Sequence, residues 1–199
     1  MHRTTLTAGC AVLLLSLAAC SGGNGEGEGE EHGHSAEADV EPVGAFGPGC
    51  ADFPDTGPGS LSAMADRPLS TAIADNPFLG RLAEVVERSG LASDLDTADD
   101  MTLFAPTDDA FDMYPTPAIQ GLLDSPDGPA HLLGHHVVLG EFGSADLDGG
   151  SFDTLNGDRI RATADEGEYT VDGYAPVVCA DVRTTNATVH VVGMLLIPS

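Results

Sequence analysis

The sequence predicts one α+β domain that follows an acidic segment with no core of its own. Residues 21–48 are rich in Gly and Glu and poor in apolar side chains, so they cannot bury enough surface to fold. From about residue 76 to residue 133 apolar residues recur at helical spacing, and from residue 137 to residue 192 they alternate as in strands. Helices in the first half and antiparallel strands in the second are typical of the α+β class.

Residues 1–19 are predicted to be a cleaved signal peptide. Arg3 precedes an uncharged apolar run that is shorter than the roughly 20 residues a transmembrane helix needs. The ending Leu17-Ala18-Ala19-Cys20 resembles the bacterial lipobox, in which the signal is cut before the cysteine and its thiol receives a diacylglyceryl group. We therefore expect a lipidated Cys20 that anchors the chain at the extracytoplasmic face of the membrane. An ordinary secretory signal that leaves Cys20 as a free thiol is the alternative.

Residues 20–48 are predicted to be a lipidated, acidic and disordered tether. The run from Gly25 to Glu31 alternates Gly with Glu, and residues 21–48 contain no Lys or Arg. His32 and His34 lie among glutamates and could hold zinc or copper weakly, but a disordered site lacks preorganised geometry. We expect no metal as the default, and we interpret the tether as a spacer.

The charge of the chain excludes nucleic acid as a partner. The chain contains seven basic residues, all Arg, and 32 Asp and Glu, so its net charge is −25. Nucleic-acid binding needs clustered basic side chains that neutralise phosphates. The same acidity repels an anionic bilayer surface, so lipid rather than a basic patch must hold the chain at a membrane.

Residues 49–199 are predicted to fold as a single domain, which begins with helices. Asn76 is placed to cap a helix with Pro77 at its first position and Gly90 just past its end. Residues 102–105 form a short apolar run typical of a buried strand. Thr107 follows this strand and can cap a short helix.

The second half is predicted to change from helices to strands. Two short helices are separated by the breaker at residues 125–129. Period-two patterns then predict strands at residues 137–139, 159–162, 169–171, 177–182 and 189–192. Turns are expected at Asn156-Gly157 and at Asp172-Gly173.

Three segments, taken in order, resemble the fasciclin domain family. They are Thr102-Leu-Phe-Ala-Pro-Thr-Asp-Asp-Ala-Phe111, His135-His136-Val137-Val138 and residues 186–198. The chain is also similar to the single-domain secreted fasciclin antigens of mycobacteria at Gly47-Pro-Gly-Cys50, Thr56-Gly-Pro-Gly59, Asp75-Asn-Pro77 and Val177-Val-Cys179. The resemblance covers about residues 60 to 198 and implies a β-wedge of mostly antiparallel strands with several short helices packed along it.

The chain departs from the family pattern at two positions. His135 stands where a Tyr usually precedes the family histidine, and Gly193 stands where an Asp usually follows the last strand. Asp181-Val182 occupies the place of an Asp-Ile pair that animal relatives use to bind integrins. This pair is a candidate binding site, but Asp followed by an apolar residue is also a common start for a strand.

The histidines of the domain are expected to be structural. His136 and His190 match family positions, where a buried imidazole bonded to the backbone is expected. His135 and His136, taken as strand residues, would point to opposite faces and could not share one metal ion. Thr107 is likewise expected to act as a helix cap.

The resemblance implies a disulfide between Cys50 and Cys179. Cys10 leaves with the signal and Cys20 carries lipid, so two cysteines remain in an oxidising compartment. Both lie in the segments that are similar to the mycobacterial antigens, in which the equivalent pair is bridged. A redox role is the competing hypothesis, but no Cys-x-x-Cys spacing supports it.

The resemblance favours a surface protein that presents its domain for adhesion or for binding protein or glycan of the envelope, the matrix or a neighbouring cell. It is an analogy, because a fold does not fix function. The alternative is an extracytoplasmic carrier of a small molecule or metal. Catalysis and a cofactor are not expected, because no nucleophile elbow, zinc-protease helix, phosphate loop or dinucleotide fingerprint is present in the sequence.

Overall fold

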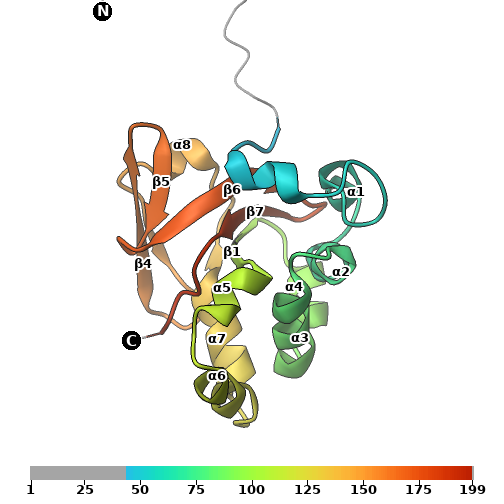
Figure 1. Ribbon diagram of the computed structural model, residues 1–199, viewed down its shortest axis with the longest axis vertical. Coiled ribbons are helices and arrows are strands. Elements are labelled where there is room, and N and C mark those ends of the chain that lie inside the picture. The colour runs from blue at the N-terminus through green and yellow to red at the C-terminus, as the bar shows by residue number, and fades with distance from the viewer. Residues whose placement is uncertain (1–43, 199) are drawn as a thin grey trace, which may run out of the picture. The chain divides into compact units, whose positions relative to one another are not determined.

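The computed structural model describes residues 44–198, which form one seven-stranded mixed sheet with helices packed against it (Figure 1). The strands are β1 (Met101–Pro106), β2 (Val137–Leu139), β3 (Ser151–Asp153), β4 (Arg159–Asp165), β5 (Glu168–Val171), β6 (Ala175–Arg183) and β7 (Ala187–Val192). The helices are the 3-10 turn η1 (Pro48–Asp52) and α1 (Leu61–Ala65), α2 (Leu69–Asp75), α3 (Gly80–Ser89), α4 (Ala92–Thr97), α5 (Asp108–Asp112), α6 (Thr116–Leu123), α7 (Gly128–His136) and α8 (Ser144–Leu147).

The sheet curves until its outer strands meet. Its strand order is β2-β1-β7-β6-β5-β4-β3, and an isolated antiparallel bridge between Val138 and Thr154 joins the β2 edge to the β3 edge. Neighbouring strands are antiparallel except β1 and β7, which run parallel, with Phe104 opposite His190. The nearly closed sheet confirms the predicted α+β fold and contains one parallel pair, β1 and β7, next to the β2 edge.

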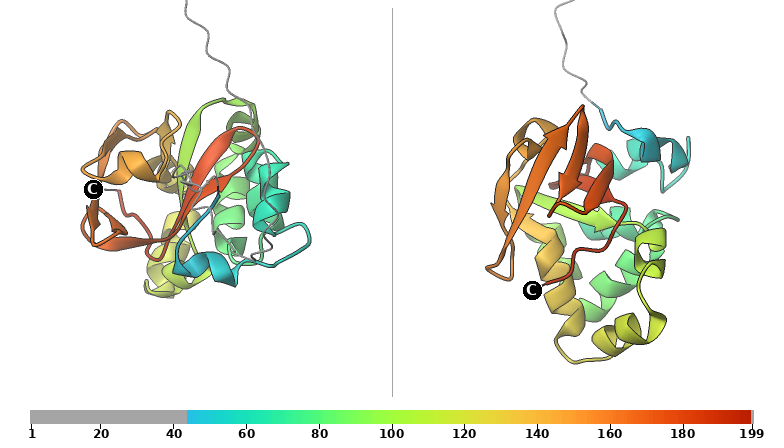
Figure 2. Two further views of the ribbon diagram at one scale, coloured as in Figure 1. Left: turned by 90° about the horizontal axis from the view of Figure 1, so that it is seen from above. Right: turned by 60° about the vertical axis from the view of Figure 1, so that its left-hand side comes forward.

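The parallel pair β1 and β7 separates two hydrophobic cores, because neighbouring residues of a strand point to opposite faces. Leu103 and Val189 belong to the helix-side core, whereas Phe104 and Val192 belong to the sheet-side core. The helix-side core also contains Leu69, Ile73, Leu82, Val85, Leu132 and Leu195. The sheet-side core is completed by Val138, Leu147, Phe152, Ile160, Val171, Ala175 and Leu196. Both views of Figure 2 show the green helices on one side and the orange strands on the other.

The predicted helix at residues 76–90 begins later than expected. Asn76 ends α2 instead of capping α3, which begins at Gly80 after a turn. Its side chain is buried between segments: the amide nitrogen donates to Gly59 O at 3.0 Å, and the amide oxygen accepts from Phe78 N at 2.9 Å. Asn76 therefore serves as a turn residue, whose oxygen accepts from the backbone two residues on, and its buried amide nitrogen is satisfied by Gly59. The end at Gly90 is confirmed, with the left-handed φ of 72° that such a position favours.

The strand assigned to His135 and His136 is wrong, because both residues close α7. The helix runs to His136 and the chain then enters β2 directly at Val137. Without a Gly or Pro between the two elements, the apolar run gives no local sign of where the helix stops. The argument that the two histidines point to opposite faces of a strand therefore does not apply.

Several short elements were not predicted. They are η1, α1, α2, α4, α8 and β3, each of seven residues or fewer. Elements of this length are held by tertiary packing, so they leave little periodicity in the sequence. None of the helices in residues 44–198 is long and apolar enough to cross a membrane.

Candidate binding cleft

A half-open cleft of about 610 Å³ lies between η1, the start of α5 and the strands β6 and β7. Its apolar surface comes from Phe53, Phe78 and Val178, and its acidic surface from Asp52 and Asp109, with Asp108 as a third carboxylate. A cavity of this size is typical of ligand sites. Figure 1 shows η1 in cyan lying over β6, with α5 on the other side of β7.

The η1 wall of the cleft is fixed by the disulfide between Cys50 and Cys179, which confirms the predicted pairing. Gly47 and Gly49 let this wall approach β6. A Cβ on Gly47 would lie 2.5 Å from the Val178 carbonyl oxygen, and one on Gly49 would lie 2.9 Å from the Val178 Cβ. The wall cannot approach so closely with larger residues.

The α5 wall is organised by Thr107 and Asp108. Thr107 caps α5, because its hydroxyl oxygen accepts from Ala110 N at 3.2 Å. Asp108 connects α5 to the next helix, since its Oδ1 accepts from Arg81 N near the start of α3 at 2.8 Å. Asp108 N donates in turn to Phe78 O at 3.0 Å. These bonds hold Phe78 in the lining of the cleft, where it is 39% exposed.

The cleft is negatively charged. Among the described residues that line it there is no Arg, Lys or His. Asp52 and Asp109 are exposed, and their carboxylates make no hydrogen bond or ion pair to the rest of residues 44–198. The guanidinium of Arg81, which follows Phe78 closely in sequence, pairs instead with Asp112 at 2.7 Å. The two outer carboxylates are therefore available to a ligand.

Asp181 and Val182, the predicted binding pair, are used inside the molecule. Val182 is 1% exposed and belongs to the helix-side core. Asp181 occupies an irregularity in β6 with a left-handed φ of 56°, which turns its carboxylate toward α8. That carboxylate accepts from Ser144 N at 2.8 Å and from Ser144 Oγ at 2.6 Å. In this arrangement Asp181 fixes α8, and the buried Val182 is not available to a partner.

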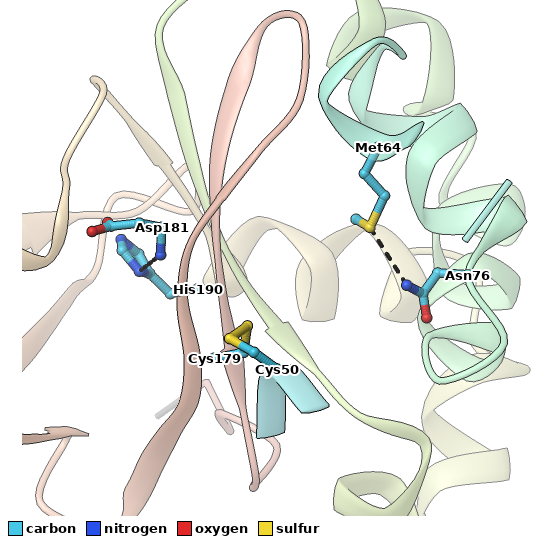
Figure 3. The surroundings of a disulfide bond; sticks show 6 residues. All are labelled: Cys50, Met64, Asn76, Cys179, Asp181 and His190. Atoms are coloured by element: carbon cyan, nitrogen blue, oxygen red, sulfur yellow. Dashed lines mark hydrogen bonds between the residues drawn. A yellow bond between two sulfur atoms is a disulfide. The ribbon is translucent and has the colours of Figure 1, made fainter. Parts of the chain in front are cut away.

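His190 is a buried connector beneath Asp181. Its Nε2–H donates to Phe142 O at 3.0 Å, which leaves Nδ1 to accept from Asp181 N at 3.4 Å. Burial lowers the pKa of His190, because the charged imidazolium would lose water. Figure 3 shows Asp181 and His190 on one side of the β6 and β7 ribbons and Met64 and Asn76 on the other, with the disulfide near the middle.

His136 connects α7 to the last segment of the domain. Its Nδ1–H donates to Leu132 O at 2.9 Å, so the neutral Nε2 accepts from Leu196 N at 3.0 Å. Burial lowers its pKa to about 4, and the backbone bond to Leu132 opposes that shift only partly. Both ring nitrogens are occupied by the protein, so this histidine has no free ligand atom for a metal.

His135 has a different partner. Its Nδ1 lies 2.8 Å from Asp158 Oδ2, and Asp158 also accepts from Thr154. Burial raises the pKa of Asp158, but the bonds from Thr154 and His135 outweigh it and hold this pKa below its usual value. No group of three or more His, Cys, Asp or Glu within residues 44–198 is arranged to hold a metal. His32, His34 and Cys20 lie outside the described residues.

The cleft was missed from the sequence because its walls come from segments far apart in the chain. Thr107 was singled out as a cap, and Gly193 as a departure from the family pattern, and both line the cleft. The signal that could have located it is the Gly-Pro-Gly sequence before Cys50 combined with the long-range disulfide. Together they indicate a segment pressed closely against a strand.

The fold and the sequence agree on the class of protein. The solved FAS1 domain pair of the insect cell adhesion molecule fasciclin I is similar to the chain with a TM-score of 0.58 and 20% sequence identity, which shows a shared fold. The match covers 68% of this chain and 52% of that one, so the chain spans about half of the domain pair. The sequence model of the fasciclin domain matches residues 79–198. The chain belongs to the fasciclin domain family.

Curated relatives place the chain beside mycobacterial surface antigens. It is 33% identical over 160 residues to the cell surface glycolipoprotein MPB83 of Mycobacterium bovis, which covers 76% of this chain and 71% of the relative. It is also 33% identical over 160 residues to the immunogenic protein MPB70 of the same species, covering 76% of this chain and 81% of that relative. This similarity supports the resemblance inferred from the segments around the two cysteines.

Proposed function

We propose that the chain is a lipid-anchored surface protein whose fasciclin domain binds a protein or glycan of the envelope, the matrix or a neighbouring cell. In this proposal residues 1–19 are the cleaved signal, residues 20–48 carry the lipid on Cys20 and act as a tether, and residues 49–199 form the domain. The last residues of the tether segment already belong to the fold, because Phe46 pairs with Ala180 of β6 and Pro48 begins η1. The protein acts by binding and not by catalysis. A relative named as a cell surface glycolipoprotein and a fold neighbour named as a cell adhesion molecule support this assignment.

The observation that carries the binding role is the cleft. It combines an exposed aromatic side chain, Phe78, with a preformed cavity of about 610 Å³ whose η1 wall is held by a disulfide. A preformed apolar cavity loses little ordering entropy when a partner enters it. The ring nitrogens of the buried His136 and His190, in contrast, are bonded to backbone atoms and leave no open position for chemistry.

The anchor is tested by fractionating cells that express the full chain. We expect the Cys20→Ala chain to leave the membrane fraction and appear in the medium, because its acidic surface has no other means of holding to a membrane. Retention of Cys20→Ala in washed membranes would contradict the lipid anchor.

The binding role is tested by attachment of cells that display the full chain to immobilised envelope preparations. We expect Phe78→Ala to reduce attachment severalfold, whereas Leu139→Ala, which removes a 63% exposed side chain outside the cleft, leaves attachment unchanged. Cells that lack the chain should attach as weakly as cells with Phe78→Ala. Equal attachment with and without the chain would remove the adhesion proposal.

A further inference from the structure

We propose that the cleft binds a segment of a partner polypeptide in which a Lys or Arg side chain adjoins an apolar one. This inference rests on the proposed binding function and names the chemistry of the partner. It follows from three features of the cleft: two unengaged carboxylates, an aromatic floor, and the acidity of the rest of the chain.

The exposed carboxylates of the cleft favour a cationic ligand. Asp52 on η1 and Asp109 on α5 line two different walls of the cleft, and Asp108, next to Asp109 on α5, adds a third negative charge. Asp108 is already used to cap α3 through Arg81 N, so the two exposed acids are the groups left to meet a ligand. A cleft lined by one sign of charge concentrates the opposite charge, and an ammonium or guanidinium group entering here meets carboxylates of both walls.

The apolar surface of the cleft favours a Lys or Arg side chain over a hydrated metal ion. The rings of Phe53 and Phe78 lie with their centroids 6.3 Å apart and tilted by 37°, and Val178 lines the cleft beside them. Lys and Arg carry a methylene stem that packs on such a surface while the charged head stays in water. A cation close to these rings also gains a cation–π contribution. A hydrated metal ion would use the carboxylates and leave the aromatic floor without a partner.

The chain itself does not supply this segment. Residues 21–48 contain no Lys or Arg, so the tether carries the same sign of charge as the cleft. A second copy of a chain with a net charge of −25 is repelled in the same way. The partner is therefore a different, basic protein. A neutral glycan would stack on the rings without any need for the carboxylates, and it becomes an outcome of the test.

The test measures binding of a defined peptide to the full chain, purified in detergent from the cells that export it. The probe is acetyl-Gly-Ser-Leu-Lys-Leu-Lys-Ser-Gly-amide, and isothermal titration calorimetry gives its affinity. We expect binding that weakens about tenfold in the double variant Asp52→Asn/Asp109→Asn, as the loss of two partly exposed ion pairs predicts. Raising the salt from about 0.05 M to about 0.5 M should weaken the native complex to a similar extent.

The matched control is Asp94→Asn/Asp165→Asn. It removes the same charge from exposed positions outside the cleft, one of them in the first turn of a helix as Asp109 is. We expect this control to bind the peptide like the native chain. Thermal unfolding of both double variants should stay close to native, because none of the four carboxylates forms a bond in residues 44–198.

Three comparison ligands separate the contributions. A peptide with acetylated lysines keeps the stems and loses the charges, and a peptide with both leucines replaced by serine keeps the charges and loses the apolar contact. Each should bind severalfold more weakly than the probe. A neutral glucan oligosaccharide that binds while the peptide does not, or peptide binding that both double variants weaken equally, would overturn the proposal.

These results also separate this inference from the function on which it rests. If attachment depends on the chain but the peptide does not bind, the partner chemistry is wrong and the adhesion role stands. If the peptide binds with the predicted dependence on Asp52 and Asp109 but attachment is the same without the chain, the cleft is a basic-peptide site and the adhesion role fails.

Discussion

The two cores on either side of β1 and β7 are held by different chemistry. The helix-side core receives Cys179 and is joined through the disulfide to the η1 wall of the cleft. The sheet-side core is bordered by polar connectors: His190 lies 5.5 Å from Phe104, centroid to centroid, and His136 accepts from Leu196 N. The helix-side core is therefore held to its neighbouring segment by a covalent bond. The sheet-side core is held by hydrogen bonds of neutral imidazoles, each of which needs one particular tautomer.

This difference teaches that one small domain can respond to two conditions independently. Reduction acts on the bond between η1 and β6, and Cys179 packs in the helix-side core, whereas His190 packs against Phe104 of the sheet-side core. Acid acts on the histidines, which lose their acceptor atoms when they take up a proton. The following predictions test whether the two responses are separate.

Removing the disulfide should give the largest change. In the chain-entropy model, a cross-link between residues 129 apart stabilises by roughly 5 kcal/mol, an upper figure because denatured-state structure reduces it. We expect Cys50→Ala/Cys179→Ala to lower the free energy of unfolding in urea by up to this amount and to weaken ligand binding in the cleft. An unchanged free energy of unfolding would show that η1 is held by packing alone.

Truncating a residue on each face of β1 compares the two cores directly. Leu103 and Phe104 are neighbours, both fully buried, and they face opposite cores. We expect Phe104→Ala to cost about 4 kcal/mol and Leu103→Ala about 3 kcal/mol, measured by urea unfolding. If reduction destabilised both variants beyond additivity, the two cores would not be independent.

Acid should act through His136 as well as through His190, because burial lowers the pKa of both imidazoles. The pKa of His136 is about 4 in the folded chain, below its ordinary 6.5, so the unfolded chain binds more protons between these pH values. The stability that the neutral ring contributes is present above pH 6.5 and declines as the pH falls toward 4, by about 3 kcal/mol. We expect His136→Gln to have a flatter pH dependence of the free energy of unfolding. Parallel curves for native and variant chains would contradict this assignment.

Removing the α5 cap should have the smallest effect. Thr107→Ala leaves Ala110 N without its side-chain acceptor and should cost about 1 kcal/mol. Because α5 forms a wall of the cleft, binding there should weaken while the acid response stays native. Thr107→Ser, which keeps the hydroxyl, is the control and should restore both the stability and the binding.

The sequence located most strands because alternation and short apolar runs are local signals. Residues 102–105, 159–162 and 189–192 fall inside β1, β4 and β7. The sequence did not predict the parallel pairing of β1 with β7, because a strand's own pattern does not indicate which distant strand lies beside it. The resemblance to the fasciclin family implied the β-wedge and the disulfide, but it did not imply the side-chain hydrogen bonds that hold the elements together.

The errors have physical causes at particular residues. Asn76 can serve either as a helix cap or as a turn residue, and only the buried surroundings from Gly59 and Met64 decide between them. His135 and His136 extend α7 because Asp158 and Leu196, both far along the chain, supply their partners. Asn186 shows the same limit: its side-chain amide donates to Leu95 O and Ala98 O, and no local pattern indicates these distant partners.

The bridge between Val138 and Thr154 affects how readily copies of the domain aggregate with one another. The two strands at the ends of the sheet are three residues long each and are joined to one another, so little unpaired backbone faces outward along them. Exposed edge strands are the places where identical domains pair with one another and aggregate. A population of this domain crowded on one surface is therefore protected against strand-to-strand assembly by its own topology, and its net negative charge adds repulsion between the copies.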